Sequence, residues 1–233
     1  MVAALADRRG LALRPIAMGA VTVDDLFEAR EQEVFDFYAR HRGRYRRALD
    51  LGANVGVHTM QMVRLGWEVR AYEPDPVHFR ALLDHCIANE ALPDWAMRQA
   101  VSDRYGRETF VRVLGNTTAS HLKGSRAHHG PVEEFEVEVV DVRPLFEWAD
   151  FAKVDVEGHE ARLLTAVRPD VRCEFMVEIG SLAAAEAIFG HFHGARPMWS
   201  QAGGWRRVER LGDVPMHYRQ GMLFIGEAPC VSS

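Results

Sequence analysis

Two apolar segments that end in polar residues constrain this chain more than any other feature. The first, Ala48-Leu-Asp-Leu-Gly-Ala-Asn-Val-Gly56, has the pattern of a strand followed by a glycine loop. The second, Trp67-Glu-Val-Arg-Ala-Tyr-Glu-Pro74, has the pattern of a strand that delivers Glu73 to its carboxyl end. Glycines let the backbone pass close to a ligand, and a carboxylate about 20 residues further on can accept both ribose hydroxyls. The pair predicts a nucleoside-containing cofactor on an α/β sheet.

The spacing of the glycine loop bears on which nucleoside it holds. A dinucleotide loop has the pattern G-x-G-x-x-G, whose second glycine leaves room for the pyrophosphate. Here Gly52 and Gly56 form G-x-x-x-G, and Asn54 stands where that second glycine would be. Such a loop suits a small zwitterionic tail, with Asp50 facing the amine. We therefore expect S-adenosylmethionine rather than NAD, since a strand–helix turn without a ligand would leave Glu73 unexplained.

Length and composition are those of a globular protein with one large domain. The chain has 233 residues, of which 48% are hydrophobic and 26% are charged, as is ordinary for globular domains. Its net charge of −5 argues against nucleic acid as a partner. No apolar run approaches the ~18 residues of a membrane span, and the first residues do not have the pattern of a signal peptide. We expect a cytoplasmic protein without a membrane partner.

Neither the cysteines nor the histidines indicate a metal site. The cysteines show no C-x-x-C spacing, so they predict neither a disulfide framework nor a zinc site: Cys86, Cys173 and Cys230. A divalent cation could be held by a set of four residues: Asp155, Glu157, His159 and His58. However, hard cations bind more oxygen ligands than this set offers. We therefore predict no metal.

Hydrophobic periodicity predicts alternating strands and helices from residue 46 onward. Residues 1–45 are expected to form an irregular lead-in and a preface helix from Val23 to Arg40, and residues 46–233 the main domain. The pattern is typical of a doubly wound α/β fold with a mostly parallel, seven-stranded sheet and an antiparallel edge hairpin. The strands expected in that sheet are 46–51, 67–72, 95–101, 151–156, 173–179, 198–207 and 221–226. A further strand pair is expected at 108–113 and 133–140, and helices at 55–65, 76–90, 142–148, 160–167 and 182–192.

Ligands of doubly wound sheets lie at the carboxyl ends of the strands, where the winding reverses. Five polar residues fall at the predicted ends: Asp50, Glu73, Ser102, Asp155 and Glu178. One crevice should collect them. The segment 115–130 is polar and glycine-rich, and a loop of that length inside a compact domain is usually functional or disordered. We expect it to cover the pocket.

The second chemically informative segment is Lys153-Val-Asp-Val-Glu-Gly-His-Glu160, in which a buried strand delivers Asp155 and turns into a helix. Helix capping accounts for one or two of its charges, but not for three acids and a histidine beside a cofactor cleft. Clustered carboxylates shift one another's pKa values, which is a recurrent active-site arrangement. We interpret the segment as a site of acceptor binding or catalysis, with capping alone as the alternative.

Several segments together match the pattern of one protein family. They are Asp50-Leu-Gly-Ala-Asn-Val-Gly56, Tyr72-Glu-Pro-Asp75, Ala100-Val-Ser-Asp-Arg-Tyr-Gly106, Lys153-Val-Asp-Val-Glu-Gly-His-Glu160 and Val177-Glu178-Ile179. In these segments the sequence resembles the FkbM-type S-adenosylmethionine-dependent methyltransferases, over about residues 48–180. The resemblance implies a Rossmann-like methyltransferase fold, S-adenosylmethionine as the cofactor, and O-methylation of a hydroxyl on a sugar or a natural product of glycoside or polyketide type.

The resemblance also assigns residues to the cofactor. It implies that Gly52, Asn54, Gly56 and Glu73 hold it, with Ser102 near the adenine. The complete cofactor-binding set that we predict is Asp50, Gly52, Ala53, Asn54, Gly56, Glu73, Pro74 and Ser102.

The acidic turn supplies the predicted catalytic residues, His159, Asp155 and Glu157. We favour His159 as the base because neighbouring carboxylates would raise its pKa and stabilise the imidazolium. Asp155 or Glu157 could instead take the proton. Glu160 and Glu178 are predicted to contact the acceptor, a small molecule with a hydroxyl group.

Two other functions are compatible with the same motifs. One is an NAD-dependent oxidoreductase on the same fold, which stabilisation by NADH rather than by S-adenosylhomocysteine would reveal. The other is a catalytically silent cofactor-binding domain that serves as a partner module. Slow turnover of S-adenosylmethionine with every acceptor would favour that function.

Overall fold

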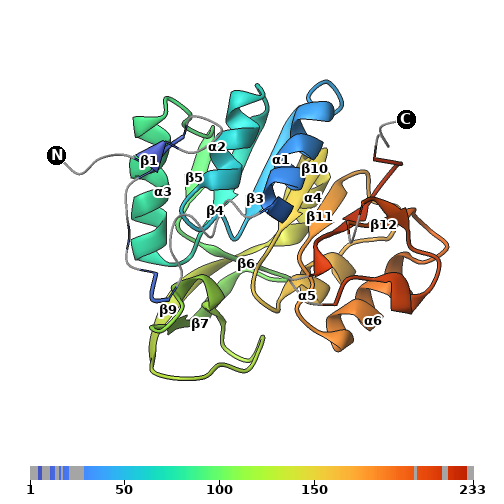
Figure 1. Cartoon of the computed structure of the whole chain (residues 1–233). Helices are drawn as coiled ribbons and strands as arrows, with labels where there is room; N and C mark the ends of the chain where they lie inside the picture. The colour runs from blue at the N-terminus through green and yellow to red at the C-terminus, as the bar shows by residue number, and fades with distance from the viewer. Residues whose placement is uncertain are drawn as a thin grey trace.

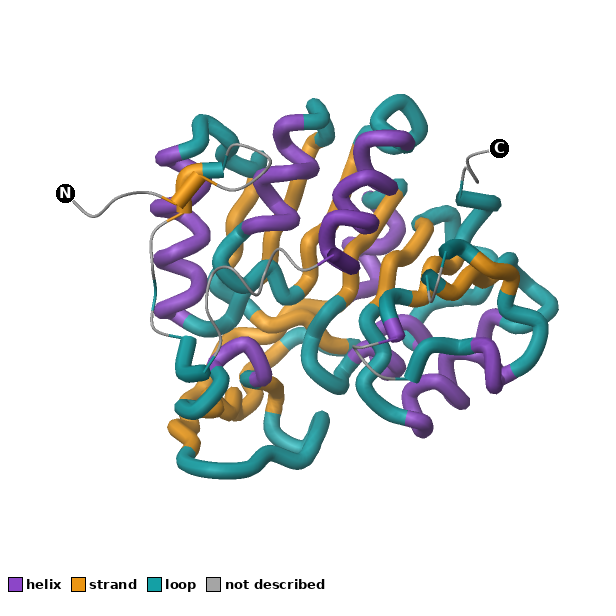
Figure 2. The backbone as a smooth tube through the Cα atoms, in the orientation of Figure 1, coloured by secondary structure: helices purple, strands orange, loops and turns teal. Residues whose placement is uncertain are grey.

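A sheet of eight strands forms the centre of the computed structural model, which describes residues 5–6, 11–13, 16, 18–20, 29–201, 204–216 and 220–229. The strand order is β13-β12-β14-β11-β10-β3-β4-β5 (Figures 1 and 2). The strands are β3 (Arg47–Leu51), β4 (Glu68–Tyr72), β5 (Trp95–Met97), β10 (Phe151–Val154), β11 (Glu174–Val177), β12 (Met198–Ser200), β13 (Arg206–Arg207) and β14 (Leu223–Ile225).

The five strands from β11 to β5 are parallel, whereas β14 is antiparallel to β11 and β12 is antiparallel to β14. The chain starts the sheet at β3, adds β4 and β5 on one side, and returns to place β10 and β11 on the other. The winding therefore reverses between β3 and β10, which leaves a crevice at their carboxyl ends. The register of this pair sets Lys153 opposite Asp50.

Within the described part of the chain, six α-helices cover the two faces of the sheet. The strands are apolar on both sides: Ala48 of β3 belongs to one core cluster and Leu49 to the other. Such strands are expected in a parallel sheet that is buried on both faces. The first cluster includes side chains of α1 (Ala29–Arg40), α2 (Val57–Arg64) and α3 (Pro76–Ala88), and the second those of α4 (Val142–Trp148), α5 (Glu160–Thr165) and α6 (Leu182–Phe192). The doubly wound α/β arrangement is thus confirmed.

A second sheet, of order β6-β9-β7-β8, lies beside the main one (Figure 1). Its strands are β6 (Ala100–Ser102), β7 (Gly106–Val113), β8 (His121–Leu122) and β9 (Val132–Asp141), and the short 3-10 helix η2 (Thr117–Ala119) follows β7. The antiparallel pair β7–β9 confirms the predicted strand pair. The remaining short elements are β1 (Leu5–Ala6), β2 (Ala12–Leu13) and the 3-10 helix η3 (Leu211–Asp213).

The structure corrects several predicted elements. The seven-stranded count is wrong because 198–207 is not one strand: β12 and β13 are separate and pair with each other, which makes eight. The single strand 95–101 is also wrong. It divides after Met97, since β5 pairs with β4 in the main sheet and β6 pairs with β9 in the second. Both halves are apolar, and the two polar residues between them, Arg98 and Gln99, do not by themselves indicate a change of partner.

The long segment 115–130 is more ordered than a loop, because it contains η2 and β8. The Asn116 side chain accepts a hydrogen bond from the backbone N–H of Thr118 and caps η2. The preface helix is confirmed from Ala29 onward, whereas its predicted start at 23–28 lies outside the described residues, as does Cys230. Among the described helices, none is long and apolar enough to cross a membrane.

Candidate active site

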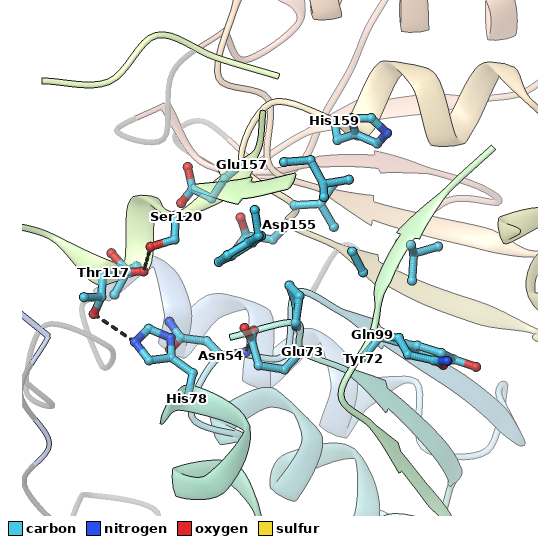
Figure 3. A pocket seen from close by; sticks show the side chains of 18 residues that line it. Asn54, Tyr72, Glu73, His78, Gln99, Thr117, Ser120, Asp155, Glu157 and His159 are labelled. Carbon is cyan, nitrogen blue, oxygen red and sulfur yellow. Dashed lines mark hydrogen bonds between the residues drawn. The ribbon is translucent and has the colours of Figure 1, made fainter. Parts of the chain in front are cut away.

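A cavity opens at the carboxyl ends of β3, β4 and β10 (Figure 3). The second sheet closes its other side with Phe110, Leu122 and the polar residues of η2. The predicted residues that line it are Gly52, Asn54, Glu73, Pro74, Asp155, Glu157 and His159. The single crevice expected from the strand ends therefore collects Glu73 and Asp155, but the lining does not include Asp50, Ser102 or Glu178.

The glycine loop is held by hydrogen bonds to the end of β4 and packs against Asp155, which follows β10. The N–H groups of Gly52 and Ala53 both donate to the carbonyl oxygen of Tyr72, at 3.0 Å each. Gly52 has φ +76°, and a Cβ there would lie 1.8 Å from the carbonyl oxygen of Asp155. Only glycine fits this approach. Gly56, with φ +88°, begins α2 in the same left-handed region.

Glu73 joins the two segments that first suggested a nucleoside. Its Oε2 accepts a hydrogen bond from the backbone N–H of Asn54, and its Oε1 accepts one from that of Asp75, both at 2.8 Å. Burial raises the pKa of Glu73 to about 8, even though these two donors and Lys153 lower it. Each carboxylate oxygen keeps a second lone pair. The carboxylate is therefore oriented and can still accept hydroxyls from the cavity.

A buried lysine connects the glycine loop to the acidic turn. Lys153 Nζ donates to Asp155 Oδ2 at 3.0 Å and to the carbonyl oxygen of Gly52 at 3.3 Å, and it lies 4.0 Å from Asp50 Oδ1. Burial alone would lower the pKa of Lys153, but Asp155 and Asp50 raise it above the usual value. The lysine is thus charged and neutralises both acids. Sequence reasoning gave Lys153 no role, although a lysine inside an apolar strand next to an aspartate was a signal for one.

Asp50, next to the glycine loop, is buried and does not line the cavity. It is fully buried, and its Oδ2 accepts a hydrogen bond from Thr59 Oγ1 at 2.5 Å. Its Oδ1 has no hydrogen-bond partner among the described residues. The neighbouring Asn54 Oδ1 is likewise buried without such a partner within the described part of the chain.

The acidic turn holds Glu157 in an unusual conformation. Its φ of +54° is in the left-handed region that side chains other than glycine rarely adopt. Its carboxylate forms an ion pair with Arg126. Burial and the charge of Asp155 raise the pKa of Glu157 to about 8, although Arg126 lowers it. Strain of this kind often marks functional positions.

Glu160 stabilises the acidic turn through hydrogen bonds to its backbone. Its Oε1 accepts hydrogen bonds from the backbone N–H groups of Val156 and Gly158, at 3.1 and 2.9 Å. The residue is buried, and burial raises its pKa to about 7. These bonds hold the turn before α5 and do not cap the helix, whose N-cap residue His159 makes no side-chain cap hydrogen bond. Glu178 follows β11, where burial and the charges of Asp155 and Glu157 raise the pKa of its carboxyl.

His159 is bracketed by two serines. Its Nε2 lies 2.9 Å from Ser102 Oγ, and its Nδ1 lies 3.0 Å from Ser125 Oγ. Burial and the charge of Arg162 lower its pKa. The predicted increase is therefore wrong, because the ring faces Ser102 and is buried rather than surrounded by the carboxylates of its own turn. Ser102 accordingly contacts His159 and does not line the cavity.

Residues distant in sequence also line the cavity without having been predicted. His78 of α3 is hydrogen-bonded through Nε2 to Thr117 Oγ1 at 2.8 Å, and both lie on the wall. Tyr72 and Gln99 line it as well. Only the fold brings His78 and Thr117 together, so no local pattern could have identified the pair. Among the described residues, no three His, Cys, Asp or Glu side chains are arranged to hold a metal ion.

Several solved structures are similar to this chain at low sequence identity. One is the Thermus thermophilus 16S rRNA N2 G1207 methyltransferase RsmC in complex with AdoMet and guanosine, with 14% identity, TM-score 0.47 and coverage of 92% of this chain and 45% of that one. Another is a precorrin-6y C5,15-methyltransferase from Geobacter metallireducens, with 12% identity, TM-score 0.45 and coverage of 97% and 96%. The bifunctional kinase-methyltransferase WbdD has 12% identity, TM-score 0.45 and coverage of 87% and 40%.

The first of these structures is longer, so this chain spans less than half of its length. No curated protein matches the sequence significantly. The model of the methyltransferase FkbM domain matches residues 50–213, which include the glycine loop, Glu73 and the acidic turn. The chain therefore belongs to the family of FkbM-domain methyltransferases.

Proposed function

We propose that this methyltransferase transfers the methyl group of S-adenosylmethionine to a hydroxyl of a sugar or natural-product acceptor. The observation that supports this most strongly is one cavity lined by the glycine loop, Glu73 and the carboxylates of Asp155 and Glu157. A nucleoside site and a site of proton acceptance thus share one space. The acceptor is then a small molecule that enters between the acidic turn and η2.

The chain's residues fit S-adenosylmethionine as the cofactor. Glu73 is oriented to accept ribose hydroxyls, and Tyr72, Pro74 and Val101 line the same cavity and can pack against adenine. Asn54 Oδ1, which has no hydrogen-bond partner among the described residues, can accept from an ammonium group.

The loop geometry also argues against a dinucleotide. A pyrophosphate needs free backbone N–H groups at the glycine loop. Here those of Gly52 and Ala53 donate to Tyr72, and that of Asn54 donates to Glu73. Three successive donors are already used, which favours the zwitterionic tail over NAD.

S-adenosylmethionine, when bound, supplies an activated methyl group, so the protein mainly has to align the acceptor oxygen with it. We assign proton acceptance to Asp155. Its side chain lines the cavity, its backbone packs on Gly52, and Lys153 fixes its orientation. A positioned base of this kind contributes about 10²–10⁴ in rate. Both ring nitrogens of His159 lie next to serine hydroxyls, so this residue is better suited to a structural role in the cavity wall.

The test is a methyl-transfer screen with isotopically labelled S-adenosylmethionine. Sugars, glycosides and polyketide-like alcohols are offered as acceptors, and the labelled product is identified by mass and by the stability of its methyl ether. The Asp155→Asn variant serves as the background control. Label on nitrogen or carbon would refute O-methylation, and stabilisation by NADH but not by S-adenosylhomocysteine would refute the cofactor.

A further inference from the structure

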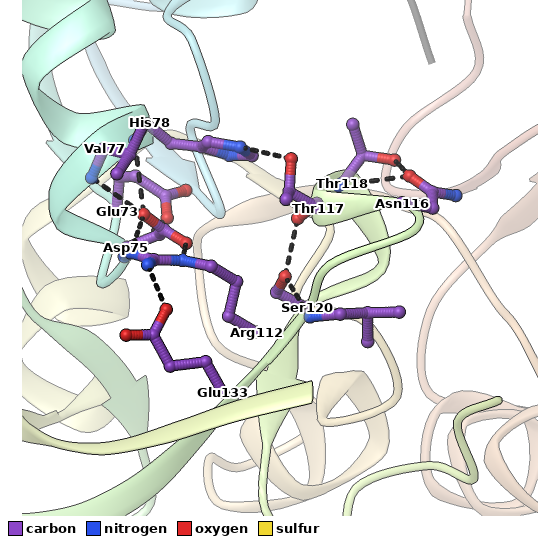
Figure 4. A network of polar contacts seen from close by, with 11 residues as sticks. Glu73, Asp75, Val77, His78, Arg112, Asn116, Thr117, Thr118, Ser120 and Glu133 are labelled. Carbon is purple, nitrogen blue, oxygen red and sulfur yellow. Dashed lines mark hydrogen bonds and ion pairs between the residues drawn. The ribbon is translucent and has the colours of Figure 1, made fainter. Parts of the chain in front are cut away.

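An ion pair connects the second sheet to the cofactor side of the cavity. Arg112, near the end of β7, donates from Nε to Asp75 Oδ2 at 2.6 Å and from Nη2 to Asp75 Oδ1 at 2.7 Å (Figure 4). The Asp75 side chain is 1% exposed and that of Arg112 is 13% exposed. A bidentate pair of this geometry fixes orientation as well as charge. The third guanidinium nitrogen, Nη1, donates to the exposed Glu133 at 2.6 Å.

Asp75 transmits this constraint to Glu73. Its backbone N–H donates to Glu73 Oε1 at 2.8 Å, and its side chain caps α3 by accepting from the N–H of Val77 at 2.8 Å. Burial alone would raise the pKa of Asp75, but Arg112 lowers it below the usual value. Without Arg112, a buried carboxylate would lie next to Glu73 with no opposite charge in contact.

A second contact supports the same turn of α3. His78 is hydrogen-bonded to Thr117 at 2.8 Å, and the carbonyl oxygen of Thr117 accepts from Ser120 Oγ at 2.7 Å. Ser120 Oγ in turn accepts from the N–H of Val113, the residue after Arg112. The segment 112–120 therefore contacts the first turn of α3 at two points, the N-cap residue Asp75 and His78.

We propose that Arg112 is a positioning residue for cofactor binding, which holds Glu73 in place through Asp75. The second sheet is then part of the nucleoside site and not only a cover over the acceptor side. The inference rests on the proposed function in so far as Glu73 receives the ribose of the cofactor. Arg112 itself does not line the cavity.

The experiment measures S-adenosylhomocysteine affinity by calorimetry in the full-length protein. Arg112→Gln should weaken binding about 5- to 50-fold, in the range of coupling through one intermediary residue. Arg112→Lys keeps the charge but loses the bidentate geometry, so it should lie between Arg112→Gln and wild type. Glu133→Gln is the matched control, since it removes the exposed partner of the same guanidinium. It should leave affinity within about 2-fold, as for exposed ion pairs.

A double-mutant cycle then distinguishes positioning from general destabilisation. If Arg112 acts through Glu73, Arg112→Gln should have little further effect on affinity in a Glu73→Ala background. Independent, additive losses would overturn the proposal, as would unchanged affinity in Arg112→Gln. Asp75→Asn provides the second variant if Arg112→Gln does not fold, because asparagine still caps the helix while losing the charge. It should weaken binding similarly, and unchanged affinity in this variant would also overturn the proposal.

The same measurement separates this inference from the proposed function. If wild type binds S-adenosylhomocysteine and Arg112→Gln binds it equally well, only the role of Arg112 fails. If wild type does not bind it, the cofactor assignment fails, and the role of Arg112 fails with it.

Discussion

Lys153 donates a hydrogen bond to Asp155 at 3.0 Å from within the buried strand β10, and the same ammonium group lies 4.0 Å from Asp50. One cation therefore balances two acids at the point where the winding of the sheet reverses. Removing one partner of a buried ion pair leaves an uncompensated charge, which costs more than the pair itself contributes.

Lys153→Met should lower the free energy of unfolding by about 3–5 kcal/mol, because Asp50 and Asp155 would lose their counter-charge. Urea denaturation of the apo protein measures this. The chain offers a matched control, since its only other lysine, Lys123, forms an exposed pair with Glu134. Lys123→Met should cost no more than about 1 kcal/mol. Equal effects of the two substitutions would contradict a special role for Lys153.

Glu73→Ala should weaken S-adenosylhomocysteine binding about 10- to 100-fold, as expected for losing two hydrogen bonds from ribose hydroxyls together worth ~1.5–3 kcal/mol. Calorimetry on the folded variant measures the change. Glu68→Ala is the control at the opposite end of the same strand, where Glu68 pairs with Arg47 at 3.5 Å. Unchanged affinity in Glu73→Ala would remove the ribose assignment.

Asp155→Asn should reduce kcat by about 10²-fold or more, because the amide cannot accept the acceptor's proton. His159→Ala should retain kcat within about 10-fold and keep the acidic limb of the pH–rate profile, as for a residue that holds other groups in place. Steady-state kinetics across pH tests both. The opposite outcome, in which His159→Ala loses the acidic limb, would establish histidine as the base, as the sequence pattern suggested.

The stability of the apo protein should fall as pH rises from about 4.5 to 7, in part through Glu160. Its folded-state pKa is raised to about 7 from an ordinary value of 4.5, chiefly by burial. A group of this kind stabilises the fold fully below its unfolded pKa, and the contribution is lost as pH rises through the folded pKa. Glu160→Gln keeps an oxygen for the N–H groups of Val156 and Gly158 but cannot titrate.

Unfolding free energies at pH 5, 6, 7 and 8 should therefore show a smaller decrease in Glu160→Gln than in wild type. A parallel pH dependence in the two proteins would mean that Glu160 is ionised throughout this range in the folded state.

Local patterns accounted for the parts of the site that lie within a few residues of one another. The glycine loop, Glu73 and the turn from Asp155 to Glu160 were all visible as a strand followed by residues of special chemistry. The same patterns predicted the alternation of strands and helices, because burial on both faces of a parallel sheet leaves a strong apolar signal. They did not separate β5 from β6, since both are apolar and the short polar interruption at Arg98 and Gln99 does not reveal that their pairing partners differ.

The sequence by itself thus determined the fold class, the family and the position of the glycine loop, because backbone preferences and hydrophobic periodicity are set by neighbouring residues. Tertiary structure decided which side chains act together. It set Ser102 and Ser125 beside His159, 57 and 34 residues away in the chain. It buried the ring near Arg162, which lowers the pKa that the local acids were expected to raise. It also brought Arg112 to Asp75 across 37 residues. Burial and charge pairing depend on what packs against a residue in space, which its sequence neighbours do not specify.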